Sequence, residues 1–200
     1  MDKKLRVTLN VRIQHPGSRM PRQEFCGRLR TAAATTTPKT LTFLPMTVSL
    51  IISTYNWPRA LYLCLDSVMQ QTAMPTEILI ADDGSGISTR DVVRHFEAVS
   101  PVPIRHIWHE DKGFRLAMIR NKAIAASRCE YIIQIDGDLI LQRNFIQDHM
   151  IFAQRGCYVT GSRGIITEML TRKVLSGEIT SLTPLMRGVR CLLYTSDAAD

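Results

Sequence analysis

The alternation of strand-like and helix-like segments along residues 48–160 is the feature that most constrains the fold. Apolar runs typical of buried strands occupy residues 48–52, 77–81, 103–108, 131–135 and 156–160. Helical spacing of apolar residues predicts helices over residues 58–68, 88–96, 114–127 and 144–153. Strands and helices that alternate at this spacing form βαβ units. The predicted fold class is therefore α/β, a mostly parallel sheet with helices on both faces.

Polar side chains follow four of these strands, at the point where each strand ends. Residues 53–56 follow the first strand, and Asp82 and Asp83 end the second. Residues 109–111 follow the third strand, and residues 136–138 follow the fourth. Open parallel sheets bind ligands outside the carboxyl ends of their strands. The sequence therefore predicts one site there, rich in carboxylates and hydroxyls.

Asp136-Gly-Asp138 is the strongest local feature of this predicted site. In a strand, side chains at i and i+2 point to the same face, and the glycine between them lets a ligand approach the backbone. Hard oxygen ligands at this spacing suit Mg²⁺ or Mn²⁺. A solvated turn explains a lone Asp-x-Asp equally well. The metal interpretation is favoured because Asp82 and Asp83 end a neighbouring strand.

Five motifs resemble the family 2 glycosyltransferases in their order and approximate spacing. They are Val48-Ser-Leu-Ile-Ile-Ser-Thr-Tyr-Asn56, Gln70-Gln-Thr72, Glu77-Ile-Leu-Ile-Ala-Asp-Asp-Gly-Ser85, Gly113-Phe-Arg-Leu-Ala-Met-Ile-Arg-Asn-Lys-Ala-Ile124 and Tyr131-Ile-Ile-Gln-Ile-Asp-Gly-Asp138. The fourth is similar to bacterial members that also carry a galactosyltransferase-like C-terminal region. The resemblance covers about residues 46–166. It implies a Rossmann-like nucleotide-diphospho-sugar transferase fold of the GT-A type.

The resemblance also implies roles for the residues of the nucleoside end of the site. Ser53 and Tyr55 would contact the nucleoside of a nucleoside diphosphate sugar, most simply a UDP-sugar, and Asp83 would contact its base. Residues 109–111 would line the sugar pocket or form a polar loop, and the sequence leaves both open. Trp57 and Trp108 are interpreted as core residues.

The remaining implied roles concern the diphosphate. Arg115 and Arg120 would hold the nucleotide and its phosphates, a task that suits guanidinium groups. For Arg120 an exposed helix charge is the alternative. Asp136 would contact the ribose or a water on the metal, and Asp138 would bind the Mn²⁺ or Mg²⁺ that bridges the diphosphate.

The implied reaction is metal-dependent, inverting sugar transfer to an acceptor hydroxyl of a glycan, as in polysaccharide synthesis of the cell envelope. A general base must take the acceptor proton, and family members carry it in a Glu-Asp pair within Gly-Trp-Gly-x-Glu-Asp. That motif does not occur in the sequence. The catalytic residue is therefore unknown, and we expect it downstream of Arg190. Residues 46–190 are interpreted as the donor half of a C-terminally truncated hexosyltransferase-type domain, inactive alone.

Both ends of the chain differ in character from this domain. The net charge is +7, and nine basic against two acidic residues within residues 1–45 account for all of it. Residues 1–45 are interpreted as a basic, low-complexity leader that is disordered or not native. Residues 191–200 resemble a translated sequencing adapter and are interpreted as a non-native tail. Because residues 46–200 are neutral, a nucleic-acid partner is not expected.

The cysteine pattern and the apolar segments bear on location. Five widely spaced cysteines without a C-x-x-C motif favour a reducing compartment. The uncharged stretch 40–58 is too polar for a membrane span, so no transmembrane segment is expected. The predicted location is the cytoplasm or the inner face of its membrane.

The sequence allows two further functional interpretations. A non-catalytic nucleotide-sugar binding module would carry the same motifs without transferring a sugar. A phosphatase nucleophile at Asp136 is disfavoured, because that chemistry usually requires a threonine where Ile140 stands.

Overall fold

A four-stranded parallel sheet forms the centre of the molecule. The computed structural model describes residues 4–14, 46–179, 182 and 186–191 of the chain. The strands lie in the order β4 (Ile104–Trp108), β3 (Glu77–Asp82), β2 (Val48–Thr54) and β5 (Tyr131–Asp136), and each pairs in parallel with its neighbours. Every residue of β2 and β3 is buried, which fits two strands covered on both faces.

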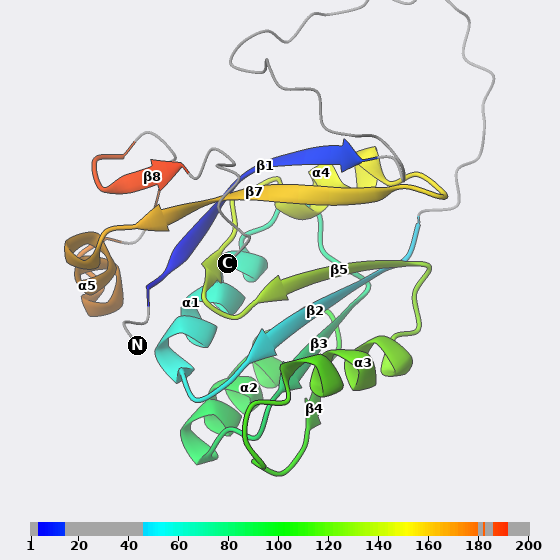
Figure 1. Cartoon of the computed structure of the whole chain (residues 1–200), viewed down its shortest axis with the longest axis horizontal. Helices are drawn as coiled ribbons and strands as arrows, with labels where there is room; N and C mark the ends of the chain where they lie inside the picture. Colours follow the sequence, from blue (N-terminus) through cyan, green and yellow to red (C-terminus); the bar gives the residue numbers. More distant parts are fainter. Residues whose placement is uncertain (1–3, 15–45, 180–181, 183–185, 192–200) are drawn as a thin grey trace, which may run out of the picture.

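Helices cover both faces of this sheet (Figure 1). One face packs against α1 (Pro58–Met69), α2 (Ile87–Val99) and α4 (Phe145–Phe152) through the largest apolar cluster. The other packs against α3 (Leu116–Ala126) through a smaller cluster that contains Ile51 and Ile119. Leu50 and Ile52 of β2 face the first layer while Ile51 faces the second. This alternation follows from the two-residue period of a strand.

A second, mixed sheet lies beside the first (Figure 1). Its strand order is β6 (Leu139–Ile140), β1 (Arg6–Gln14), β7 (Tyr158–Ile166) and β8 (Val189–Cys191). Strand β1 runs parallel to β6 and antiparallel to β7. Helix α5 (Glu168–Ser176) follows β7. A separate apolar cluster holds this part together and includes Leu5, Val7 and Ile166.

The predicted elements of the parallel sheet are confirmed, with most boundaries moved by a few residues. The fifth predicted strand, at 156–160, is longer in the structure and forms β7, which lies in the second sheet, antiparallel to β1, and is not part of the parallel sheet. The two-residue strand β6 and strand β8 have no counterpart among the sequence-based expectations.

Strand β1 differs from the expectation for residues 1–45. Residues 6–14 were expected to lack ordered structure, yet they form a strand between β6 and β7. Apolar Val7, Leu9, Val11 and Ile13 alternate with polar residues, which is the pattern of a half-buried strand. The basic composition around this pattern obscured it. The expectations for residues 15–45 and 192–200 fall outside the described residues.

Candidate functional site

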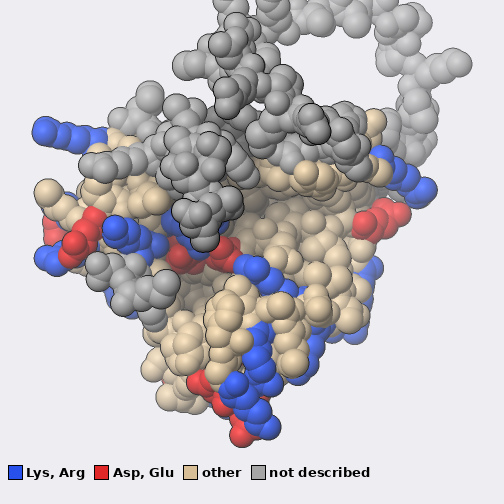
Figure 2. Space-filling model, in the orientation of Figure 1, with Lys and Arg blue, Asp and Glu red and all other residues tan. Residues whose placement is uncertain are grey.

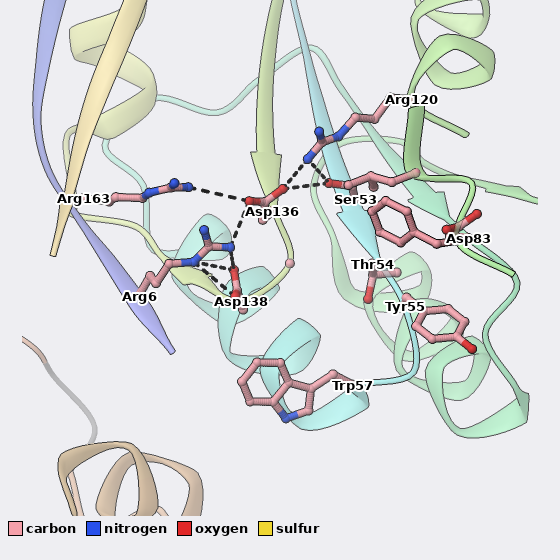
Figure 3. Close-up of a pocket in the computed structure, with 13 residues that line it drawn as sticks. Arg6, Ser53, Thr54, Tyr55, Trp57, Asp83, Arg120, Asp136, Asp138 and Arg163 are labelled. Atoms are coloured by element: carbon pink, nitrogen blue, oxygen red, sulfur yellow. Dashed lines mark hydrogen bonds and ion pairs between the residues drawn. The ribbon is translucent and has the colours of Figure 1, made fainter. Parts of the chain in front are cut away.

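A cleft with a volume of about 630 Å³ lies at the carboxyl ends of β2, β3 and β5 (Figure 3). The register of the sheet brings its polar residues together, because Ser53 lies opposite Asp136 and Thr54 opposite Asp82. The volume is typical of a small-molecule site. The lining residues are Arg6, Ser53, Thr54, Tyr55, Trp57, Asp83, Phe114, Leu116, Arg120, Asp136, Gly137, Asp138 and Arg163.

Asp136 stands at the centre of a charged network. Its carboxylate accepts hydrogen bonds from Ser53 Oγ at 3.1 Å, from Arg6 Nη2 at 2.9 Å and from Arg120 Nη2. Arg163 Nη1 lies 3.9 Å away on β7. Burial by itself would raise the pKa of Asp136, but the charges of Arg6 and Arg120 outweigh it and lower the pKa. Asp136 is therefore ionised at neutral pH.

Asp138 is bound by Arg6 as well. Arg6 Nε lies 3.1 Å from both carboxylate oxygens of Asp138, and Arg6 Nη2 contacts Oδ1. Figure 3 shows the Arg6 side chain reaching from β1 to both aspartates. Between Asp136 and Asp138, Gly137 donates its N–H to Ser53 O at 2.7 Å, and a Cβ on Gly137 would lie 3.1 Å from the same oxygen. The absence of a side chain at Gly137 therefore lets its backbone lie close to β2.

The Asp136–Asp138 pair has the oxygen ligands that Mg²⁺ and Mn²⁺ prefer. In this structure, however, both carboxylates are ion-paired with Arg6. Among the described residues, no group of three or more His, Cys, Asp or Glu side chains is arranged to hold a metal ion. The pair fits a divalent cation by its chemistry, and the same oxygens are paired with a guanidinium.

Asp83 occupies another part of the cleft and is held by residues from the segment after β4. Its Oδ1 lies 2.6 Å from His109 Nε2, and its Oδ2 accepts the backbone N–H of Arg115 at 2.9 Å. Asp83 and His109 are 3% and 7% exposed. Lys122 Nζ lies 3.5 Å from the other ring nitrogen of His109. His109 therefore lies behind Asp83 instead of in an open polar loop.

The neighbouring Asp82 has a structural role. It is fully buried, accepts the Ser85 N–H at 2.8 Å and lies 2.9 Å from His106 Nε2. Burial would raise its pKa, but the hydrogen bonds from His106 and Ser85 outweigh that effect and lower the pKa. Of the two adjacent aspartates, Asp82 fixes the turn after β3 and Asp83 faces the cleft.

The loop after β4 crosses directly over the turn after β3. Gly84 has a φ of +97°, and a Cβ there would lie 2.6 Å from Asp111 Cα. Asp111 Oδ2 in turn accepts a hydrogen bond from Tyr55 OH at 2.9 Å. Gly84 thus permits the contact between the two loops, and Tyr55, which follows β2, holds the loop after β4 at the edge of the cleft.

Six of the seven predicted site residues line the cleft: Ser53, Tyr55, Asp83, Arg120, Asp136 and Asp138. Arg115 is different, because its guanidinium contacts Glu110 O and Met118 Sδ while its backbone N–H binds Asp83. Its role in phosphate binding stays a prediction. Trp57 lines the cleft, and Trp108, expected in the core, is 42% exposed.

Sequence reasoning missed two cleft arginines and one buried partner. Arg6 and Arg163 come from the second sheet, whose pairing no local pattern predicts. His109 was expected to line the sugar pocket or to belong to a polar loop, and neither alternative predicts its contact with Asp83. On the face drawn in Figure 2, basic and acidic side chains lie next to each other near the middle of the molecule, in keeping with these ion pairs.

A parallel sheet covered on both faces, with a charged cleft at its strand ends, defines an α/β protein of the Rossmann-like, ligand-binding kind. The chain belongs to Glycosyl transferase family 2, whose family model matches residues 49–195. The fold is accordingly that of the GT-A glycosyltransferases. In the described part of the chain, no helix has the length and apolar character that crossing a membrane requires.

Individual relatives match only in part. The chain is 27% identical to the chondroitin synthase of Escherichia coli over 143 residues, which is 66% of this chain and 20% of that protein. It is 31% identical to validoxylamine A glucosyltransferase of Streptomyces hygroscopicus subsp. limoneus over 102 residues, covering 50% and 22%. The crystal structure of S. aureus TarS matches with a TM-score of 0.47 and 23% identity, over 54% of this chain and 19% of that one. The chain thus spans about a fifth of each.

Proposed function

We propose that the protein binds a nucleoside diphosphate sugar in this cleft and serves as the donor half of an inverting glycosyltransferase. The observation that carries the proposal is the placement of Asp83 and the Asp136–Asp138 pair in the same cleft, together with Arg120. A nucleotide sugar has a base with N–H donors at one end and a doubly charged diphosphate towards the other. The cleft offers an acceptor and a set of charged groups, which are the kinds of group that such a ligand requires.

Asp83 is suited to recognise the base. A carboxylate has about four acceptor positions, and His109 and the Arg115 N–H use two of them. The remaining lone pairs can accept a ring N–H of a base such as uracil. Because both oxygens of Asp83 are already fixed, base binding would cost little further ordering of this side chain.

Arg120 and the aspartate pair are suited to the diphosphate. Arg120 donates to Ser53 Oγ at 3.2 Å and to Asp136, so its guanidinium is fixed at the wall of the cleft. Asp138, with Asp136, would hold Mn²⁺ or Mg²⁺, which when bound supplies positive charge to the departing diphosphate. Arg120 would stabilise the same developing charge by hydrogen bonds.

The acceptor side requires a general base, and we expect it downstream of Arg190. Each carboxylate that lines the described cleft already has a partner: Asp83 is hydrogen-bonded to His109, and the other two are ion-paired with Arg6. This observation also favours a second candidate, a non-catalytic nucleotide-sugar binding module. The proposed partners are a UDP-sugar and a glycan acceptor, and the proposed location is the cytoplasm or the inner face of its membrane.

Calorimetric titration of the full chain with UDP, in Mn²⁺ and then in EDTA, tests the proposal. We expect saturable binding that Asp83→Asn weakens by about tenfold, the loss of one charged hydrogen bond. Asp91→Asn, on the exposed side of α2, removes the same charge from a residue that does not line the cleft and should bind as the wild type does. Absence of UDP binding by folded protein would refute the proposal.

Sugar transfer separates the two candidates. A gene that continues beyond Arg190 should yield a protein that transfers the sugar of a UDP-sugar to a glycan acceptor. A longer protein that binds UDP but transfers no sugar from any donor tested would favour the binding module.

A further inference from the structure

Arg6 is fixed at the aspartate pair by its backbone as well as by its side chain. Its backbone N–H donates to Asp138 O at 2.9 Å, and Arg6 lies opposite Leu139 in the parallel ladder between β1 and β6. Leu5 and Val7, on either side, are almost fully buried in the apolar cluster beneath the second sheet. The position of the guanidinium is therefore part of the fold of β1.

The guanidinium lies between the two carboxylates. Arg6 Nη2 is 2.9 Å from Asp136 Oδ2, and Arg6 Nε is 3.1 Å from each oxygen of Asp138. The side chains of Arg6 and Asp138 are only 20% and 21% exposed. A cation that binds both aspartates must share these oxygens with a group that already carries a full positive charge.

We propose that Arg6 is a built-in cation that competes with Mg²⁺ or Mn²⁺ for Asp136 and Asp138, so that strand β1 sets the metal affinity of the site. The use of the metal in sugar transfer rests on the proposed function. The competition itself depends only on the two carboxylates and the arginine.

Charge balance supports the competition. The two aspartates are matched by Arg6 and Arg120, and Arg163 adds a third guanidinium 3.9 Å from Asp136. A divalent cation added to this set meets carboxylates that are already neutralised. Removing Arg6 frees both oxygens of Asp138 and leaves Asp136 Oδ2 with Arg163 alone, at 3.9 Å. The metal affinity should then rise, because a carboxylate without a guanidinium partner in a partly buried site attracts a cation more strongly than a paired one does.

Titration of the full chain with Mn²⁺ tests the inference without relying on activity. The electron paramagnetic resonance signal of free Mn²⁺ measures how much of the metal is bound. We expect Arg6→Ala to bind Mn²⁺ at least about tenfold more tightly than the wild type. Arg94→Ala removes the same charge from the exposed side of α2 and should leave the affinity unchanged. Adding Asp138→Asn to Arg6→Ala should abolish the gain, which assigns it to this pair.

Arg6→Gln guards against a folding defect, because it keeps the aliphatic stem of the side chain and places an amide N–H near the position of Nε while it removes the charge. Circular dichroism and thermal unfolding identify which variants are folded. Arg6→Gln should also bind Mn²⁺ more tightly than the wild type. A folded Arg6→Ala or Arg6→Gln protein with wild-type or weaker Mn²⁺ affinity would overturn the proposal.

UDP titrations of the same samples keep this inference separate from the proposed function. A gain in Mn²⁺ affinity in Arg6→Ala without any UDP binding would support the competition and refute nucleotide-sugar binding. Metal-dependent UDP binding, with equal Mn²⁺ affinity in wild type and Arg6→Ala, would refute the competition and leave the proposed function standing.

Discussion

His109 Nε2 lies 2.6 Å from Asp83 Oδ1, and both side chains are almost entirely buried at the end of β3. The histidine comes from the loop after β4 and reaches Asp83 from behind, on the side away from the cleft lining. Together with the Arg115 N–H it fixes both oxygens of the carboxylate. His109 is thus a positioning residue for the group that we propose to bind the base.

His109→Ala should weaken UDP binding by about tenfold, because Asp83 loses one of its two fixed partners. His109→Gln places an amide N–H near the position of Nε2 and should restore part of the affinity. His95→Ala, on the exposed surface of α2, is the matched control. The measurement is calorimetric titration with UDP; equal affinity for His109→Ala and the wild type would contradict the positioning role.

Gly84→Ala should destabilise the protein by about 3 kcal/mol, because the new Cβ meets backbone in a left-handed conformation. The Cβ would lie 2.6 Å from Asp111 Cα, at a φ of +97°. Gly86→Ala is the control, since the nearest atom to its Cβ is Asn56 Oδ1 at 3.9 Å. Urea unfolding measures both changes, and a Gly84→Ala protein as stable as Gly86→Ala would disprove the steric explanation.

Because of His149, the free energy of unfolding should decrease as the pH is lowered from 6.5 to 4. Its Nδ1 lies 3.2 Å from Tyr131 OH, its ring packs against Phe145, and burial lowers its pKa from 6.5 to about 4. The unfolded chain therefore takes up the proton at a higher pH than the folded one. The contribution of neutral His149 to the free energy of unfolding is fully present above pH 6.5, and the free energy of unfolding falls by about 3 kcal/mol as the pH reaches 4.

Urea unfolding at a series of pH values checks this prediction. His149→Leu removes the titrating group and should flatten the curve in this window, whereas His95→Leu, at an exposed position, should leave the slope in place. A wild-type free energy of unfolding that stays constant from pH 6.5 to pH 4 would show that His149 is not held neutral.

Glu77→Gln should cost about 2 kcal/mol at neutral pH, the scale of hydrogen bonds to a buried charged group. Glu77 is 5% exposed and accepts hydrogen bonds from Ser49 Oγ at 2.7 Å, the Arg128 N–H at 2.8 Å and Arg105 Nη1 at 3.3 Å. Burial would raise its pKa, but these hydrogen bonds and the charge of Arg105 outweigh it and lower the pKa below 4.5.

The sign of the pH effect follows from that shift. Stability from Glu77 is present above its unfolded pKa and is lost as the pH falls through the lower folded value. The loss on acidification should therefore be shallower in Glu77→Gln than in the wild type, and unchanged in the exposed-site variant Glu97→Gln. Parallel acid-unfolding curves for Glu77→Gln and wild type would exclude this contribution.

Sequence reasoning located the cleft through the strand ends. Ser53, Asp83, Asp136 and Asp138 each lie within three residues of the end of an apolar run, and parallel pairing places such positions at one edge of a sheet. The strand-end pattern alone does not separate Asp82 from Asp83, and only the family resemblance singled out Asp83, because the choice depends on which carboxylate meets His106 and which meets His109. These partners lie more than twenty residues further along the chain, and no local pattern marks them.

The second sheet was harder to predict for a related reason. Its strand β1 has the alternating pattern of a strand, but β6 has only two residues. The other partner of β1, strand β7, is separated from it in the sequence by most of the chain. Periodicity predicts that a segment is extended without indicating its neighbours. Arg6 therefore looked like one of several basic residues near the start of the chain, and its contact with two aspartates became visible only in three dimensions.

The position of β1 also has a consequence for the order of assembly during synthesis. Arg6 pairs with Ile165, so residues that leave the ribosome early must wait for a partner that is made much later. The parallel sheet, complete once β5 has been made, can form before β1 finds its place. We expect the nascent chain to pass through a stage in which Asp136 and Asp138 are already at the sheet edge but are not yet paired with Arg6.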